Sequence, residues 1–428
     1  MLLLGDVVIF LISLWLMLFM RYGEFPSQKL FNQHLVPFSI LFIAWILVFF
    51  IAGLYEKHTN ILRSKLPTII LNTQIVNVFV AISFFYLIPY FGITPKTNLF
   101  IYLAVSVALV LVWRLNGYKL IGVGKRQKAL LIGSGEEMRE LKAEVDNNSR
   151  YSLSFVSTID LDELNDIDFQ EEVIKRVYAD EITVIVADLK NDKVQPVLPH
   201  LYNLIFSKVR FVDMHRVYED IFDRIPLSLV QYNWFLENIS VGPKATYDSL
   251  KRITDLVLTF LVGLFSLILY PFIFLAIKLD DGGPIFFTQE RVGKNNKAVK
   301  IIKFRSMKDG MVTATGAFLR KTRLDELPQL WNVLMGDLSL VGPRPEIPVL
   351  GKEYEEQIPY YNIRHLIKPG LSGWAQIYHD QHPHHKSDVH ETRVKLSYDL
   401  FYIKNRSFIL DLKIALKTFK KLASRAGR

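Results

Sequence analysis

The densest group of ionisable side chains lies between residues 320 and 346. Two adjacent carboxylates, Asp325 and Glu326, follow a short basic stretch, and Pro328 comes two residues after them. Because proline fits a helix only in its first turn, we expect a helix to begin near Asp325, with this carboxylate at or beside the N-cap. A helix N-terminus and the neighbouring cations, Arg320 among them, would keep Asp325 ionised and attract phosphate.

The residues of this expected helix separate into two faces. At 100° per residue, Asp325, Gln329 and Asn332 share one face. The opposite face is apolar and holds Leu324, Leu327, Trp331 and Leu334. We expect the polar stripe to face a site and the apolar stripe to face the core. A plainer interpretation stays open, in which Asp325 only caps the helix and Glu326 is a solvated residue of its first turn.

Three further groups of residues have types and spacing suited to phosphate. Lys303 and Arg305 are one residue apart, so in a strand both would project to the same side, and Gln289 and Arg291 have the same spacing. Arg344 lies between two prolines that restrict its backbone, which suits a guanidinium held against phosphate. The alternatives are a solvated strand edge for the two pairs and a structural turn for Arg344.

The composition indicates a membrane protein of two or three domains. The chain has 428 residues, half of them hydrophobic, and a net charge of 51 − 42 = +9. Its mean hydropathy is positive, which excludes a disordered chain and an ordinary soluble enzyme. Because the chain has no cysteine, it can hold no disulfide, thiolate metal site or cysteine nucleophile.

Four stretches in the first quarter are apolar and near the ~17–25 residues that a membrane-spanning helix needs. They are Leu2 to Met20, Val36 to Leu54, Thr68 to Tyr90 and Thr97 to Trp113. Basic residues are concentrated in the second connection and after the fourth stretch, which places both, and the N-terminus, in the cytoplasm. We therefore predict a four-helix transmembrane region over residues 1–120.

Residues 127–245 have the alternation of apolar runs and helical stretches that is typical of a parallel sheet. The turn Gly133-Ser134-Gly135 is similar to a dinucleotide-binding turn, but Glu136 and Glu137 stand where a pyrophosphate would bind. We expect a degenerate Rossmann-like α/β module. A regulatory or oligomerising role fits it better than nucleotide binding, which leaves association into a homo-oligomer open.

A second membrane segment begins after Lys251-Arg252. Leu256 to Ile277 is uncharged and long enough to span, but Pro271 lies inside it and would bend a helix. The segment either spans or turns back at Pro271. Because basic residues predominate between Lys278 and Lys308, we predict a re-entrant hairpin over residues 253–278, with both soluble parts on the cytoplasmic side.

Two C-terminal features admit two interpretations each. Histidines cluster between His379 and His390 and could bind a transition metal, but the polar residues and proline among them favour an exposed loop. From Phe408 to the end the sequence reads as a basic amphipathic helix, which could lie among lipid headgroups or pack on the protein surface. We favour the loop and the membrane contact.

Five motifs in chain order resemble the bacterial sugar transferase family, whose members are monotopic polyprenyl-phosphate sugar-1-phosphate transferases. The resemblance covers about residues 247–428, and the four spans with the α/β module are similar to the N-terminal part of the family's large members. The motifs are Gly283 to Gly293, Lys303 to Met307, Leu324 to Gln329, Val341 to Pro345 and Pro369 to Trp374. The implied fold is an α+β cytoplasmic catalytic domain attached to the membrane by the hairpin.

The resemblance also implies an activity. Members transfer a sugar-1-phosphate from a UDP-sugar to undecaprenyl phosphate, release UMP and begin a surface polysaccharide. In such an enzyme Asp325 would be the nucleophile that forms a phosphosugar ester, beside Glu326 and with Mg²⁺ bound at Asp325, while Arg320 and Arg344 would handle phosphate. A carboxylate can form an acyl phosphate and a divalent cation neutralises diphosphate oxygens, so the residues agree with this chemistry.

Two other functions are weighed against this one. A membrane-attached nucleotide-sugar dehydratase or epimerase would need a Tyr-x-x-x-Lys pair in a second dinucleotide-binding unit, but Tyr247 and Lys251 stand beside the membrane segment without a glycine turn before them. A non-enzymatic membrane scaffold would not need Asp325. We expect a protein of the bacterial cytoplasmic membrane that contacts lipid and has no nucleic-acid partner.

Overall fold

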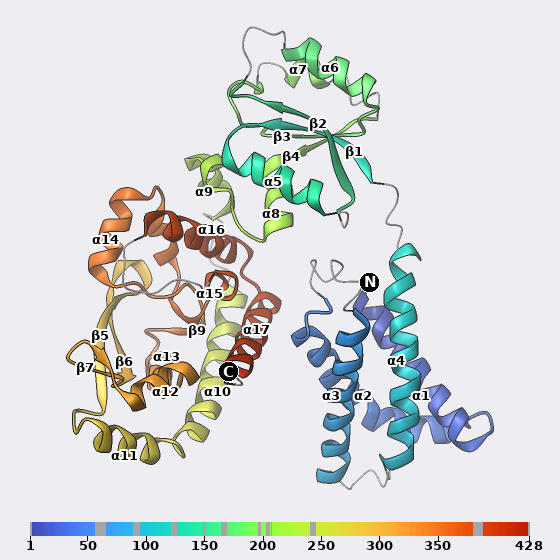
Figure 1. Cartoon of the computed structure of the whole chain (residues 1–428), viewed down its shortest axis with the longest axis vertical. Coiled ribbons are helices and arrows are strands. Elements are labelled where there is room, and N and C mark those ends of the chain that lie inside the picture. The colour runs from blue at the N-terminus through green and yellow to red at the C-terminus, as the bar shows by residue number, and fades with distance from the viewer. Residues whose placement is uncertain are drawn as a thin grey trace.

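The structure, a computed structural model, has three parts: an N-terminal helical bundle, an α/β module and a larger C-terminal domain (Figure 1). The residues that it describes are 2–55, 66–88, 95–120, 126–148, 151–163, 169–195, 198–202, 206, 208–239, 245–379 and 388–426. The histidines at 382, 384 and 385 lie outside these ranges.

The bundle contains the helices α1 (Leu2–Tyr22), α2 (Gln28–Ile51), α3 (Leu66–Leu87) and α4 (Pro95–Leu120). Three of them, α1 to α3, are long and apolar enough to cross a membrane. Helix α4 is 26 residues long, and its apolar part among the described residues is Asn98–Arg114. Large apolar side chains cover the outside of the bundle, as lipid contact requires, and inside it Asp6 of α1 pairs with Arg114 of α4.

The α/β module has a four-stranded sheet in the order β2-β1-β3-β4, with all pairs parallel. Its elements are β1 (Gln127–Gly133), α5 (Gly135–Asn147), β2 (Leu153–Asp160), α6 (Phe169–Ala179), β3 (Val184–Ala187), α7 (Leu198–Leu201), β4 (Arg210–Asp213) and α8 (Met214–Phe222). Strands β1 and β3 are almost wholly buried because helices cover both faces of the sheet. The order 2-1-3-4 is that of the second doubly wound class, not the 3-2-1-4 order of the dinucleotide-binding class.

The glycine turn of this module has the predicted backbone but not an anion site. Gly135 has φ of +81°, a left-handed conformation that glycine adopts without strain, and α5 begins there. Glu136 and Glu137 form the first turn, and the Glu137 carboxylate accepts a hydrogen bond of 3.1 Å from the Ser228 backbone N–H. Carboxylates thus occupy the helix N-terminus at which a phosphate would bind.

The C-terminal domain is built around an antiparallel hairpin and a set of short helices. Its strands are β5 (Phe286–Val292), β6 (Ala298–Phe304), β7 (Met307–Lys308), β8 (Met311–Val312), β9 (Ser339–Val341) and β10 (Gly370–Ser372). Its helices are α10 (Ala245–Ser266), α11 (Tyr270–Asp280), α12 (Ala314–Thr322), α13 (Gln329–Met335), α14 (Pro348–Gln357), α15 (Trp374–Tyr378), α16 (Val389–Asn405) and α17 (Phe408–Ala426). The pairs β5–β6 and β7–β8 are antiparallel, and β9–β10 is parallel.

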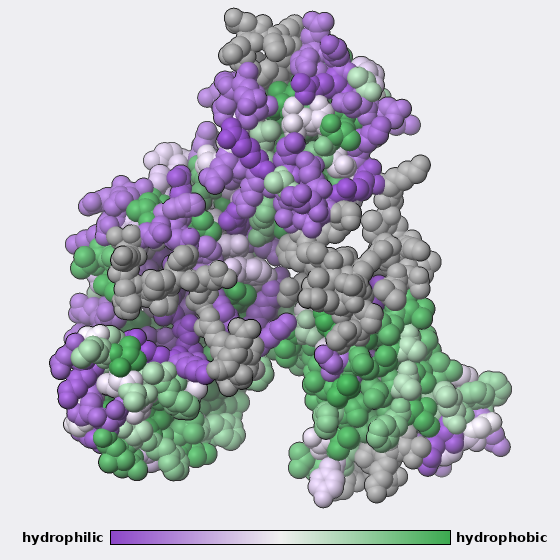
Figure 2. All heavy atoms as spheres, viewed as in Figure 1, coloured by the Kyte–Doolittle hydropathy of each residue, from purple (hydrophilic) through white to green (hydrophobic). Residues whose placement is uncertain are grey.

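Helices α10 and α11 form the predicted broken membrane segment. They are bent by 58° at a short break, and Pro271 stands in the first turn of α11, where proline costs no hydrogen bond. One side of α11 packs on Phe304 and Leu319, beneath the hairpin, whereas Phe272 and Leu275 are exposed. Figure 2 shows apolar residues over this segment and over the bundle at the same end of the molecule, and polar residues over the α/β module.

Residues before the predicted boundary at 247 contribute to the hydrophobic core of the C-terminal domain. Helix α9 (Tyr232–Asn238) and the segment before it belong to the same buried cluster as α14 and α16. This cluster contains Ile225, Val230, Trp234, Phe235, Tyr354, Ile358, Tyr361, Leu396, Leu400 and Ile403. A fragment that begins near residue 246 would lose four of these side chains, so the smallest fragment with an intact core begins before Ile225.

Candidate active site

One cavity of about 860 Å³ in the C-terminal domain is lined by the eight catalytic and phosphate-binding residues predicted from the sequence. These residues come from four segments that are separate in the sequence: β5, β6 with the following turn, the end of α12 with the turn after it, and the loop after β9. They are Gln289, Arg291, Lys303, Arg305, Arg320, Asp325, Glu326 and Arg344. The site therefore depends on tertiary packing and not on one local motif.

The alternation of side chains along the β5–β6 hairpin explains why both spaced pairs reach this cavity. Gln289 and Arg291 lie on one face of β5, and the Arg291 guanidinium donates a hydrogen bond of 2.7 Å to the Gln289 side-chain oxygen. Lys303 near the end of β6 and Arg305 just after it line the same cavity. Arg305 is held by an ion pair of 2.9 Å with Asp281, which joins the site to the end of α11.

Glu326 is the centre of an ion-pair network. Its carboxylate oxygen Oε1 lies 3.0 Å from Lys303 Nζ, 3.5 Å from Arg323 Nη1 and 3.6 Å from Arg344 Nη2. Burial alone would raise the pKa of Glu326, but Arg344, Lys303 and Arg323 outweigh it and hold the pKa at about 2. Glu326 is therefore ionised at neutral pH and holds together cations from three segments.

Asp325 lies beside this network without joining it. Its side chain is buried, and the oxygen Oδ1 has no hydrogen-bond partner. Burial and the neighbouring Glu326 charge raise the pKa of Asp325, whereas Lys303, Arg323 and Arg320 oppose the rise. The sequence predicts that the cations next to Asp325 favour its charged form, but burial, and after it the Glu326 charge, outweighs them. One carboxylate of the pair is thus neutralised by cations, and the other has a buried oxygen, Oδ1, without a hydrogen-bond partner.

The local backbone differs from the predicted helix start. Helix α12 ends at Thr322, its C-cap Arg323 has a left-handed φ of +58°, and Asp325 lies in the 3₁₀ turn Leu324–Glu326. Helix α13 begins only at Gln329 and ends at Met335, and its C-cap is Gly336, where φ of +94° suits glycine. Asp325 is therefore presented by a tight turn between two short helices, and its side chain caps no helix in this structure.

The two predicted faces are confirmed only in part: Asp325 lines the cavity and Leu324 and Leu327 pack against the core, but Trp331 does not. Gln329 and Asn332 are buried, whereas Trp331 and Met335 are half or more exposed. Asn332 donates a hydrogen bond of 2.7 Å to the Lys300 carbonyl and accepts one of 3.1 Å from the Ile302 backbone N–H. Asn332 therefore fastens α13 to β6, next to Lys303, and of the predicted apolar stripe Trp331 is exposed.

Arg344 is positioned by a close backbone contact between two of the sequence motifs. The Gly342 N–H donates to the Ser372 carbonyl at 2.8 Å, and the Gly370 N–H donates to the Pro343 carbonyl at 2.9 Å. A Cβ atom at Gly370 would lie 2.1 Å from the Gly342 nitrogen, so only glycine allows this approach. The loop that carries Arg344 is thus fixed to β10.

Sequence reasoning missed a second, buried ion pair behind this loop. Arg364 Nη2 lies 2.8 Å from Asp399 Oδ2 and donates a hydrogen bond of 3.0 Å to the Arg344 carbonyl. Burial raises the pKa of Asp399 to about 6, although Arg364 opposes the rise. Both residues line the cavity. They lie outside the five motifs, and their only signal was a pair of charged residues in otherwise apolar stretches.

The cavity also extends to residues around the histidine-rich segment. His379 at the end of α15 contacts the Glu391 carboxylate near the start of α16, and Gln376 and Lys395 line the same end of the cavity. Among the described residues, no group of three or more histidine, aspartate and glutamate side chains could hold a metal ion, and His390 is exposed. His379 thus forms part of the cavity wall.

Comparison with known proteins agrees with this site. A model of the family described as bacterial sugar transferase matches residues 246–425. The UDP-N-acetylgalactosamine-undecaprenyl-phosphate N-acetylgalactosaminephosphotransferase of Aeromonas hydrophila is 35% identical over 57% of this chain and 59% of its own length. The exopolysaccharide production protein PSS of Rhizobium leguminosarum bv. phaseoli is 40% identical over 38% of this chain and 94% of its own.

A further relative extends the similarity to the N-terminal half. The UDP-glucose:undecaprenyl-phosphate glucose-1-phosphate transferase of Klebsiella pneumoniae is 28% identical over 97% of this chain and 93% of its own length. The matched part of the Aeromonas protein, in contrast, is less than two thirds of that protein. Because the family model covers the whole cavity, and the Rhizobium protein matches over nearly all its length, the chain belongs to the bacterial sugar transferase family.

Proposed function

We propose that this protein transfers a sugar-1-phosphate from a UDP-sugar to undecaprenyl phosphate, releases UMP and initiates a surface polysaccharide. The names of the relatives from Aeromonas and Klebsiella support the substrates, and that of the Rhizobium protein supports the polysaccharide. The observation that carries the proposal is the different environment of the two carboxylates that line the cavity. Glu326 forms ion pairs with three cations, whereas Oδ1 of Asp325 has no hydrogen-bond partner.

The transfer proceeds in two steps at Asp325. An oxygen of its carboxylate attacks the phosphorus attached to the sugar, the bond from this phosphorus to the bridging oxygen breaks, and UMP leaves with that oxygen. A phosphate oxygen of the lipid then attacks the same phosphorus and displaces the Asp325 carboxylate, which regenerates the enzyme. Lys303, Arg320 and Arg344 face the diphosphate and offset the charge on its oxygens.

The site around Asp325 suits one Mg²⁺ ion whose coordination would be completed by the phosphates of the substrate. Mg²⁺ in phosphate-transfer sites takes one or two protein carboxylates and several phosphate or water oxygens. Asp325 Oδ1 is buried and unpartnered, whereas Glu326 is already neutralised by three cations. Asp325 would therefore be the protein ligand, and the ion would neutralise diphosphate charge.

Release of UMP tests this function directly. We expect the purified full chain, incubated with undecaprenyl phosphate, Mg²⁺ and a panel of UDP-sugars, to release UMP with one of the sugars and to form a lipid-linked diphosphate sugar. The matched control omits the lipid and shows no more than one UMP per enzyme molecule. A lipid-dependent reaction that releases no UMP, or no reaction with any UDP-sugar, would contradict the proposal.

The second candidate function, a dehydratase or epimerase, loses its only supporting residues. Tyr247 and Lys251 both contact the Asp411 carboxylate, with distances of 2.7 and 3.0 Å. They therefore join α10 to α17, and neither belongs to a dinucleotide site.

We infer that α10 and α11 enter the membrane and return to the cytoplasmic side, and that α4 completes a four-helix membrane region. At the first end of the hairpin, Arg252 contacts the C-terminus of α13. At the second end, Asp280 accepts a hydrogen bond of 2.7 Å from the Thr315 backbone N–H at the start of α12. Because both ends are attached to one domain, a return path fits the contacts better than a crossing. Helix α4 packs along α1 and α3.

Cysteine labelling tests this topology, since the chain has no cysteine of its own. Ser249 before the hairpin and Lys294 after it are both exposed. We expect an impermeant maleimide added outside intact bacteria to label neither Ser249→Cys nor Lys294→Cys, and to label both after the cells are opened. External labelling at Lys294→Cys alone would show that the segment crosses the membrane.

A further inference from the structure

Helix α10 buries polar side chains and exposes apolar ones. Asp255 and Thr259 are buried, whereas Ile253 and Val257 are more than half exposed. This arrangement suits a helix whose outer face meets lipid and whose inner face meets protein. A buried carboxylate in such a helix is costly unless it has partners, so the partners of Asp255 identify what the helix holds.

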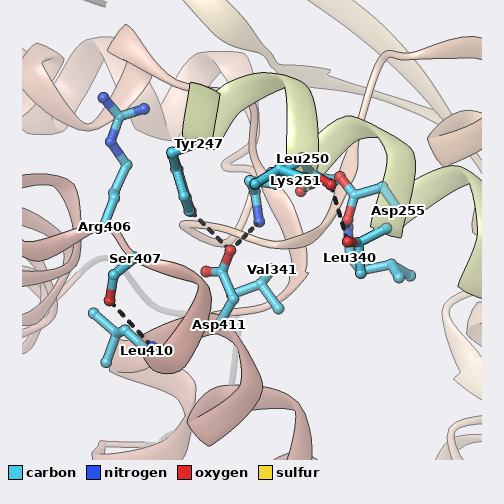
Figure 3. Close-up of polar contacts among 12 residues, drawn as sticks. Tyr247, Leu250, Lys251, Asp255, Leu340, Val341, Arg406, Ser407, Leu410 and Asp411 are labelled. Atoms are coloured by element: carbon cyan, nitrogen blue, oxygen red, sulfur yellow. Dashed lines mark hydrogen bonds and ion pairs between the residues drawn. The ribbon is translucent and has the colours of Figure 1, made fainter. Parts of the chain in front are cut away.

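Asp255 holds the strand that leads to Arg344. Its oxygen Oδ2 accepts a hydrogen bond of 2.7 Å from the Ser339 hydroxyl, and Oδ1 accepts one of 3.3 Å from the Leu340 backbone N–H. Figure 3 shows Asp255 of α10 pointing to Leu340, which is the middle residue of β9. The chain continues from β9 into the loop that carries Arg344.

Arg252, one turn earlier on α10, holds the segment that follows the acidic pair. Its guanidinium donates hydrogen bonds of 2.6 and 2.8 Å to the carbonyl oxygens of Val333 and Leu334. These carbonyls belong to the last turn of α13, where the Val333 carbonyl also accepts a hydrogen bond of 3.1 Å from the Gly336 N–H. Arg252 therefore fixes the far end of the short helix that begins three residues after Glu326.

A third contact keeps α10 from sliding along the domain. The Asp411 carboxylate of α17 accepts hydrogen bonds from the Tyr247 hydroxyl at 2.7 Å, from Lys251 Nζ at 3.0 Å and from the Tyr402 hydroxyl at 2.7 Å. In Figure 3, Tyr247 and Lys251 reach this carboxylate from α10. The position of α10 is thus set on one side by α17 and on the other by β9 and α13.

We propose that Arg252 and Asp255 are positioning residues through which the membrane helix sets the distance between the acidic pair and Arg344. The two segments that they hold meet in the cavity, where Arg344 Nη2 lies 3.6 Å from Glu326 Oε1. Because Arg252 and Asp255 share one rigid helix, the two halves of the site keep their spacing only while that helix is seated. The inference rests on the proposed function, since its effect is measured on the transfer reaction.

Asp255→Asn tests the proposal, with Asp248→Asn as the matched control on the same helix. Asp248 is 44% exposed and pairs only loosely with Arg406, at 3.5 Å. We expect Asp255→Asn to lower kcat by roughly ten- to a hundred-fold with little change in the KM for the UDP-sugar, because a small displacement of a catalytic group has that effect. Asp248→Asn should retain wild-type kcat. Ser339→Ala, which removes only a hydroxyl, should lower kcat in the same direction by a few-fold.

A double-substitution cycle separates positioning from general support of the fold. In an Arg344→Lys background, Asp255→Asn should cause little further loss, because the guanidinium that it positions is already gone. An equal loss in both backgrounds, or equal kcat for Asp255→Asn and Asp248→Asn, would overturn the inference while wild-type turnover upholds the proposed function. A wild-type protein that releases no UMP would instead contradict the proposed function and, with it, the inference.

Discussion

Asp325→Asn is expected to lower turnover by about three orders of magnitude or more while the protein stays folded. Asparagine has the shape of aspartate, and because Oδ1 of Asp325 has no hydrogen-bond partner, an amide NH2 at that position breaks no hydrogen bond. It cannot offer an anionic oxygen to phosphorus. The measurement is UMP release with excess UDP-sugar and lipid, accompanied by the thermal unfolding temperature, which should remain within a few degrees of the wild type.

The two-step route makes a separate prediction for the same pair of proteins. Labelled UMP should exchange into the UDP-sugar without any lipid acceptor in the wild type, because the first step is reversible on its own, and should not exchange in Asp325→Asn. Exchange that requires the lipid, or undiminished turnover in Asp325→Asn, would favour direct attack by the lipid phosphate.

Glu326→Gln is expected to lower turnover by about 10²-fold and to shift the acidic limb of the pH–rate profile. Removing one partner of a buried ion pair destabilises a protein by about 3–5 kcal/mol when the other charge is left uncompensated. Part of this loss would raise the free energy of the transition state and so lower the rate. Here Lys303, Arg323 and Arg344 would all lose their common anion. Glu356→Gln, an exposed change in α14, is the control and should leave the rate unchanged.

The direction of the pH shift follows from the charges. Asp325 must be ionised to attack phosphorus. Burial and the Glu326 charge raise its pKa above the ordinary value of 3.8. The wild-type rate should therefore rise with pH along the acidic limb, with a midpoint above 3.8. Glu326, with a pKa of about 2, stays charged along that limb. Glu326→Gln removes a negative charge near Asp325, so the limb should move to lower pH. A limb that stays or moves upward would show that Asp325 is not the titrating group.

The residues of the cavity were predictable where a local rule fixed them. The one-residue spacing of Lys303 and Arg305 and of Gln289 and Arg291 identifies one face of a strand, and the hairpin brings both pairs to the same cavity. The five motifs, together with the acidic pair, indicated the family, which the comparisons confirm. The broken membrane helix followed from Pro271 in an apolar stretch.

Other features depend on information that periodicity does not contain. The helical pattern assigned Leu324 and Leu327 to the core correctly but gave Trp331 and Asn332 the wrong environments, because an apolar side chain reads the same in the sequence whether it meets a core or an outer surface. Trp331 and Met335 are outward, and Asn332 is inside. The pair Arg364–Asp399 joins residues far apart in the sequence and belongs to no motif, so only the folded chain reveals it.

The inclusion of α9 in the catalytic core has a consequence for biosynthesis. Trp234 and Phe235 leave the ribosome before the membrane hairpin, but their partners Leu396, Leu400 and Ile403 come well after it. Helices α10 and α11 therefore leave the ribosome while the C-terminal part of this core is still missing, and the apolar side chains of α9 stay uncovered until then. Closing so long a loop is slow, and it exposes the nascent chain to aggregation or to chaperones until α16 has emerged.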